Sequence, residues 1–292
     1  MDARVNSLPL IAQLQQFAPA RVDTPQGAVQ FLRACSPGYE GPVTHVLLHG
    51  IGSAAGSWLA QLLAAQHTPV PISHVLAWDA PGYGDSTPLP GDAPTAADYA
   101  ARMWAWLDAV GVPARTPFML VGHSLGALMA ASAAAQQPER VRRLVLLAPA
   151  QGYAGADAAL RAQKLSERLA SLAMLGPAGM AAKRASAMLS PGASPEQIGF
   201  VEYVMAGIHP HGYTQAARML SGGDVLADLR GLRCPVVVAS GSADSVTPAH
   251  GCQTLAESIG ARYLPLGEVG HSCALEAGDR VNRLLGIVEG QA

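Results

Sequence analysis

The feature that most constrains the fold of this chain is a short turn bracketed by two glycines, Gly122-His123-Ser124-Leu125-Gly126. An apolar run at residues 118–121 precedes the turn, and an alanine-rich segment at 127–137 follows it without a helix breaker until Pro138. This succession predicts a buried strand, a tight turn and a helix. Because a side chain at either glycine would collide with the neighbouring strand or helix, the turn presents the Ser124 hydroxyl above the edge of the sheet.

Segments that predict strands and helices alternate on both sides of this turn. The predicted strands lie at residues 29–34, 43–48, 74–78, 118–121, 141–148, 235–240 and 261–266. The predicted helices lie at residues 7–17, 57–65, 95–110, 127–137 and 248–259, and a last one begins near Glu276. This alternation predicts an α/β fold, with a mostly parallel sheet covered by helices on both faces.

The alternation stops between residues 151 and 223. This stretch contains no convincing strand but has four helical segments, at 158–175, 179–189, 195–206 and 213–220. We therefore expect residues 1–150 and 224–292 to form the core, and residues 151–223 to form an inserted helical cap over one end of the sheet. The apolar side chains expected inside the cap are Leu172, Met174, Leu175, Met180, Met188, Val201, Val204 and Met205.

Composition limits the classes of function. The chain has 292 residues and a formal net charge of -2, and its Lys and Arg residues form no dense run, so we expect no nucleic-acid partner. No apolar stretch reaches the ~18–20 residues needed to cross a bilayer, and residues 1–17 do not resemble a signal peptide. We expect a cytoplasmic protein without a membrane partner, and a homodimer stays open. The four cysteines, Cys35, Cys234, Cys252 and Cys273, lack metal or redox spacing, so we expect reduced thiols, no metal and no cofactor.

Two residues further along the chain are candidates to activate Ser124. A serine hydroxyl is a weak nucleophile unless a base takes its proton and a third group orients that base. Asp244 follows the predicted strand at 235–240, and His271 follows the one at 261–266. Because loops that follow parallel strands share one edge of a sheet, Ser124, Asp244 and His271 can converge there as nucleophile, orienting acid and base.

These residues resemble those of the α/β-hydrolase family over nearly the whole chain. The order Ser, Asp, His is the order of that family. The other matching motifs are His49-Gly50, Asp79-x-x-Gly82-x-Gly84-x-Ser86 and Gly270-His271. The resemblance implies the α/β-hydrolase fold and an oxyanion hole built from the backbone N–H groups of Ile51 and Leu125. Each such donor typically contributes ~3 kcal/mol of transition-state stabilisation.

Two branches of the family differ in the bond that they cleave. Residues 244–248, residues 270–276 and His211-Gly212-Tyr213 resemble 3-oxoadipate enol-lactonases, although the elbow reads His-Ser-Leu where those enzymes usually have Leu-Ser-Met. Meta-cleavage-product hydrolases, which break C–C bonds, usually carry Gly-Pro-Gly in the oxyanion loop and tryptophan after the catalytic histidine. This chain has Gly52-Ser53-Ala54 and Ser272 instead.

The resemblance therefore favours a serine esterase or lactonase that acts on small, largely apolar substrates through an acyl-serine intermediate. A C–C bond hydrolase is the first alternative, and a ligand-sensing or non-catalytic protein of the same fold is the second. Three side chains are candidates for lining the pocket, although each could equally belong to the core: Trp58, Met129 and Tyr203. We expect His49 to shape its loop and His123 to pack beside the elbow.

Overall fold

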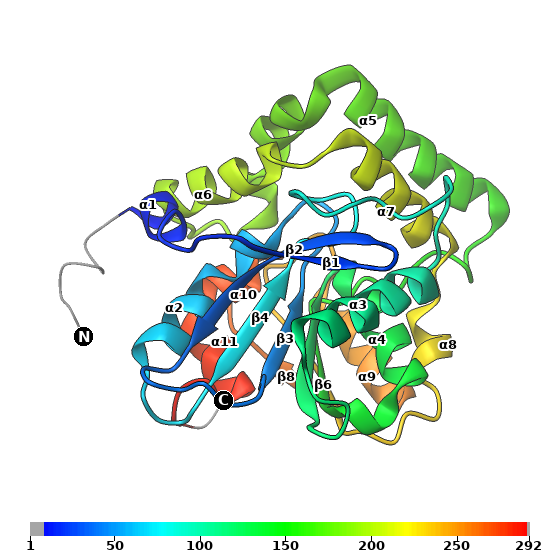
Figure 1. Ribbon diagram of the computed structural model, residues 1–292. Coiled ribbons are helices and arrows are strands. Elements are labelled where there is room, and N and C mark those ends of the chain that lie inside the picture. Colours follow the sequence, from blue (N-terminus) through cyan, green and yellow to red (C-terminus); the bar gives the residue numbers. More distant parts are fainter. Residues whose placement is uncertain (1–8, 291–292) are drawn as a thin grey trace.

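One eight-stranded sheet organises residues 9–290, the part of the chain that the computed structural model describes (Figure 1). The strands are β1 (Ala20–Thr24), β2 (Gly27–Cys35), β3 (His45–Leu48), β4 (His74–Trp78), β5 (Phe118–His123), β6 (Val141–Leu147), β7 (Val236–Ser240) and β8 (Arg262–Pro265). Their order is β1-β2-β4-β3-β5-β6-β7-β8. Strand β2 is antiparallel to β1 and β4, and all other neighbours are parallel. The predicted mostly parallel sheet is confirmed.

Helices cover both faces of this sheet, as predicted. One face carries α3 (Ala96–Val110), α4 (Gly126–Gln136), α8 (Val225–Leu229) and α9 (Ala249–Ser258), and the other carries α2 (Leu59–His67), α10 (Cys273–Glu276) and α11 (Gly278–Leu285). Short 3-10 turns are η2 (Ala55–Trp58), η3 (Pro138–Arg140) and η4 (Ser186–Met188). Among residues 9–290, no helix combines the length and the apolar character that a membrane span requires.

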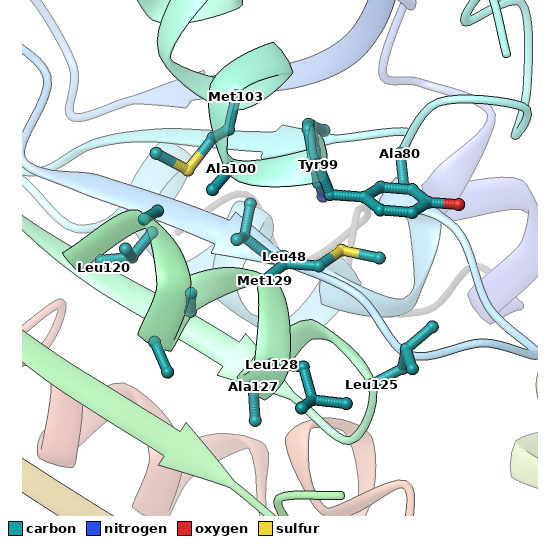
Figure 2. Packing of buried hydrophobic residues seen from close by; sticks show 14 of the residues in the cluster. Leu48, Ala80, Tyr99, Ala100, Met103, Leu120, Leu125, Ala127, Leu128 and Met129 are labelled. Atoms are coloured by element: carbon teal, nitrogen blue, oxygen red, sulfur yellow. The ribbon is translucent and has the colours of Figure 1, made fainter. Parts of the chain in front are cut away.

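Strand residues divide between two cores with the period of two that a pleated strand imposes. In β3, Val46 and Leu48 belong to the core beneath α3 and α4, whereas Leu47 belongs to the core beneath α2 and α11. The parallel strands therefore lie buried between two helical layers, which explains their nearly continuous apolar sequences. Figure 2 shows part of the first core, where Leu48 lies beside Met129 and Tyr99.

Some elements differ from the sequence prediction. Strand β1 was missed because it forms the edge of the sheet and its Ala-Arg-Val-Asp-Thr sequence alternates half-buried and exposed positions, without an apolar run. Helix α8, only five residues long, was also missed. The predicted helix at 7–17 is shorter, α1 (Leu10–Leu14), and its first two predicted residues lie outside the described part.

Helices α5 (Ala158–Arg184), α6 (Pro195–Ala206) and α7 (Pro210–Gly222) connect β6 to β7 and lie together above one end of the sheet (Figure 1). Two predicted helices are joined in α5, which kinks at Gly176, where φ is 62°, before Pro177. The expectation that Met174 lies inside is wrong, because its side chain is 79% exposed. Leu172, two residues earlier, is buried, and positions two apart on a helix face different sides.

The start of α3 offers a test of this local structure. Thr95 Oγ1 accepts a hydrogen bond from Asp98 N, and Asp98 Oδ2 accepts one from Thr95 N, which together form a capping box. We expect Thr95→Ala to lower the free energy of unfolding in urea by ~1 kcal/mol, because the helix loses its cap. The control Thr254→Ala, on the exposed surface of α9, should change it by less than ~0.5 kcal/mol. Equal effects of the two variants would contradict a specific capping role.

Candidate active site

The predicted turn between β5 and α4 holds Ser124 in a strained backbone conformation. Its φ is 52°, and within residues 9–290 only Ala148 among the other non-glycine residues has a positive φ. A Cβ at Gly122 would overlap the carbonyl of Gly126, and a Cβ at Gly126 would overlap the carbonyl oxygen of Leu48. The close approach of these backbones requires both glycines. The serine is thereby held at the carboxyl edge of the sheet, and such strained positions are frequent at functional sites.

Asp244 and His271 form a buried hydrogen-bonded pair at the same edge. His271 Nδ1 lies 2.9 Å from Asp244 Oδ2, and Oδ1 of the same carboxylate accepts hydrogen bonds from the backbone N–H groups of Val246 and Thr247 at 2.8 and 2.9 Å. Burial raises the pKa of Asp244, but hydrogen bonding and charge at His271, with the hydrogen bonds of Thr247, outweigh it and hold the pKa below the usual value. The carboxylate stays ionised and orients the imidazole.

His123 connects the elbow to the histidine loop. Its Nε2 lies 2.8 Å from the carbonyl oxygen of His271, and the centroids of the two imidazole rings are 4.9 Å apart. Burial, with a smaller contribution from the charge of His271, lowers the pKa of His123 to about 3. His123 is therefore neutral and donates its Nε2–H to that carbonyl. His271 Nε2 makes no hydrogen bond to residues 9–290, so this nitrogen can take a proton.

The two residues expected to supply oxyanion donors, Ile51 and Leu125, line the cavity at Ser124, and their backbone N–H groups have no partner among the described residues. His49 orients the first. Its Nδ1 lies 2.8 Å from the carbonyl oxygen of Gly50, and its Nε2 accepts a hydrogen bond from Ala80 N. Because a peptide group is planar and trans, a carbonyl that points to His49 directs the N–H of Ile51 to the opposite side.

The cavity beside these groups has a volume of about 300 Å³ and contains Ser124, His271, Ile51 and Leu125 in its wall. Its apolar wall comes largely from the helices between β6 and β7, through Met180, Met188, Phe200, Val201, Val204 and Met205. Of the residues predicted to line a pocket, Trp58 does so. The wall of the cavity is therefore mostly apolar, and it holds the polar groups around Ser124 and two arginines of α5, Arg168 and Arg184.

Tyr203 and Met129 do not line this cavity, which corrects the prediction. Tyr203 is 46% exposed, because α6 turns Val201, Val204 and Met205 inward and leaves residue 203 on its outer side. Met129 is buried in the core between α4 and α3 (Figure 2). In both cases the residue type was compatible with a pocket, but the orientation of the helix directs the side chain away from the cavity.

Some residues of the site were missed by sequence reasoning. Thr247 Oγ1 lies 2.8 Å from Asp244 Oδ2, 3.2 Å from His271 Nδ1 and 3.0 Å from the carbonyl oxygen of Ala148. Glu276 accepts hydrogen bonds from Ser190 N and Oγ and from Gly270 N, and so joins the loop between η4 and α6 to the histidine loop. Both residues lie in the stretches 244–248 and 270–276 that resemble the enol-lactonases, but no pattern in the sequence indicated what their side chains bind.

A protein-family model described as "Alpha/beta hydrolase family" matches residues 46–284. The chain therefore belongs to the α/β-hydrolase family, as its motifs predicted, and it is a hydrolase of that family.

Related proteins align with this chain over different lengths. The putative carbamate hydrolase RutD of Klebsiella pneumoniae is 29% identical over 264 residues, which cover 82% of this chain and 88% of that protein. The (lyso)-N-acylphosphatidylethanolamine lipase of Mus musculus is 33% identical over 109 residues, but these cover 36% of this chain and only 29% of the lipase. The similarity to the lipase therefore concerns a part of each chain.

Solved structures share the fold. A thermophilic esterase from Thermogutta terrifontis superposes with a TM-score of 0.76 at 20% identity, over 92% of this chain and 96% of that one. The enol-lactonase from Burkholderia xenovorans superposes with a TM-score of 0.76 at 18% identity, over 91% of this chain and 98% of that one. At these identities the likeness shows the fold alone.

Asp244→Asn tests the orienting role of this carboxylate. We expect kcat for ester hydrolysis to fall by about 10⁴, because an amide would stabilise the wrong imidazole tautomer. The exposed Asp85→Asn, which makes the same chemical change, should leave kcat unchanged. An active Asp244→Asn variant, combined with a severe loss in Asp79→Asn, would place the acid after β4 instead of β7.

Proposed function

We propose that this protein hydrolyses carboxylic ester or lactone bonds through an acyl-Ser124 intermediate. The observation that carries the proposal is the buried Asp244–His271 pair. His271, whose Nε2 is unbonded, lines the same cavity as the strained Ser124, and so do Ile51 and Leu125, whose backbone N–H groups have no partner among the described residues. A nucleophile, a base, an orienting acid and oxyanion donors at one cavity are the parts that acyl transfer needs.

The proposed reaction has two halves. Ser124 Oγ attacks the carbonyl carbon while His271 Nε2 takes its proton, and the developing oxyanion accepts hydrogen bonds from the N–H groups of Ile51 and Leu125. The tetrahedral intermediate collapses, the C–O bond breaks, and His271 returns the proton to the leaving alcohol oxygen. Water then attacks the acyl-Ser124 ester with His271 again as the base, which releases the acid and restores the hydroxyl.

We assign the selection of substrates to the helical segment between β6 and β7. We take residues 151–223 as a cap over a core made of residues 1–150 and 224–292. The cap methionines can adapt the cavity wall to several substrate shapes, because the methionine side chain is flexible and polarizable. A cavity of about 300 Å³ suits small, largely apolar substrates.

Replacing the proposed nucleophile is the direct test. We expect Ser124→Ala to lose kcat by about 10⁴–10⁶ while keeping the fold, because only one hydroxyl is removed. The hydrolysis of a p-nitrophenyl ester measures the loss, and mass spectrometry of the wild-type protein should detect an acyl group on Ser124. Ser166→Ala, the same change at an exposed position of α5 outside the cavity, serves as the control and should keep its activity. Normal turnover by a folded Ser124→Ala variant would refute the mechanism, and an absence of turnover by the wild-type chain would favour the non-catalytic alternative.

The type of bond is tested with a substrate panel. We expect esters and enol-lactones to be hydrolysed faster than a ring-fission dienoate, because Ser272 and Gly52-Ser53-Ala54 replace the residues usual in C–C hydrolases. EDTA should leave the rates unchanged, since the proposed steps use only protein groups. Preference for the dienoate would reverse the assignment to C–C cleavage, and loss of activity in EDTA would contradict the serine mechanism.

A further inference from the structure

Two arginines give the cavity a positive charge that its wall does not neutralise. Arg168 and Arg184 both come from α5 and both line the cavity, and no Asp or Glu of residues 9–290 lines it. Within the same residues Arg184 makes no hydrogen bond or ion pair. Arg168 interacts electrostatically only with Glu167, whose exposed carboxylate is hydrogen-bonded to Gln163 and Lys164.

Helix geometry explains why these side chains reach the cavity. Arg184 lies four residues after Met180 and four before Met188, and all three line the same wall. Its neighbour Lys183 lies on the exposed side of the helix. In the first half of α5, Arg168 precedes the buried Leu172 by four residues, which places it on the inward face. The arginines therefore occupy positions where the rest of the helix carries apolar side chains.

The presence of two cations in this mostly apolar cavity wall requires a physical explanation. An arginine guanidinium is a permanent planar cation whose donors match the two oxygens of a carboxylate. Arg168 and Arg184 are half-buried in the cavity wall, and even a partial removal of a guanidinium from water is unfavourable unless an anion compensates. In this cavity no described side chain can supply that anion, and the charge-assisted pair that would form with a bound carboxylate is among the stronger hydrogen-bonded interactions in proteins.

We propose that the substrate carries a carboxylate, separate from the bond to be cleaved, which Arg184 and Arg168 bind while Ser124 attacks the ester or lactone carbonyl. The inference rests on the proposed function and narrows its substrate class. The arginines belong to α5, above the sheet edge that holds Ser124 (Figure 1), so the anionic end and the reacting carbonyl occupy different parts of one cavity. A monoester of a short dicarboxylic acid meets this description at about 300 Å³.

The kinetic test uses two esters of nearly the same shape. The p-nitrophenyl monoester of glutarate ends in a carboxylate, and p-nitrophenyl isoheptanoate ends in an isopropyl group. We expect the wild-type protein to prefer the glutarate ester in kcat/KM. Arg184→Met should lower this preference by about 10-fold, and Arg168→Met/Arg184→Met by about 100-fold, since a hydrogen bond to a charged group is lost at each position. The rate with isoheptanoate should change little.

Matched variants separate charge at the site from general effects. Lys183→Met removes one positive charge from the adjacent, exposed position of α5 and should leave the preference unchanged. Arg184→Lys keeps the charge without the planar fork and should restore part of the preference. Unfolding midpoints in urea identify any variant that is destabilised. An equal fall in kcat/KM for both esters in the arginine variants would overturn the inference, and so would a loss of preference in Lys183→Met as large as in Arg184→Met. The esterase assignment would stand in either case.

A binding measurement decides the inference even if neither ester is hydrolysed. In Ser124→Ala, calorimetry should find that monoethyl glutarate binds at least about 10-fold more tightly than ethyl isoheptanoate, and that added salt weakens the difference. The double arginine variant should abolish it. Inorganic phosphate is a competing anion, and stronger competition by phosphate than by glutarate would overturn the carboxylate assignment. Equal binding of the two esters, or no binding of either, would also overturn it.

Discussion

The structure of the candidate site depends on the close backbone contacts of one turn. Ser124 has a positive φ between β5 and α4, and a Cβ at Gly122 or Gly126 would overlap neighbouring carbonyl groups. A strained conformation of this kind persists only where the surrounding structure determines it fully. Buried strands on both sides of β5, with α4 packed across them, supply that constraint. The Ser124 hydroxyl is consequently presented at the sheet edge where the loops after β3, β7 and β8 also begin.

Neutral and ionised polar side chains around this turn fix the neighbouring loops of the candidate site by hydrogen bonds. His49 and His123 are both buried, which lowers the pKa of each, so they act as neutral hydrogen-bonding groups between loops. Asp244, by contrast, keeps its charge because His271 and Thr247 surround its carboxylate with donors. The same connections reach the helical segment, since Glu276 binds both Ser190 and Gly270. Glu276 therefore connects the loop of the proposed base, His271, to the helical segment that forms the cavity wall.

Much of the fold followed from local patterns. The elbow, the helix expected at 95–110 and the buried parallel strands were predictable because each depends on residues close in sequence or on a continuous apolar run. The edge strand β1 lacks such a run, and α8 is too short to show a helical period. The meeting of Asp244 and His271 was inferred from the rule that loops after parallel strands share one edge, and their 2.9 Å contact agrees with that inference.

By itself the sequence determined the α/β class, the family and which residue types could carry the chemistry, because these depend on periodicity and short motifs. Only the tertiary structure decided which helix faces line the cavity. Tyr203 and Met174 lie outside, Met129 belongs to the core, and Arg168 and Arg184 contribute charge to the wall. The physical reason is that rotation of a helix about its axis depends on packing against distant elements.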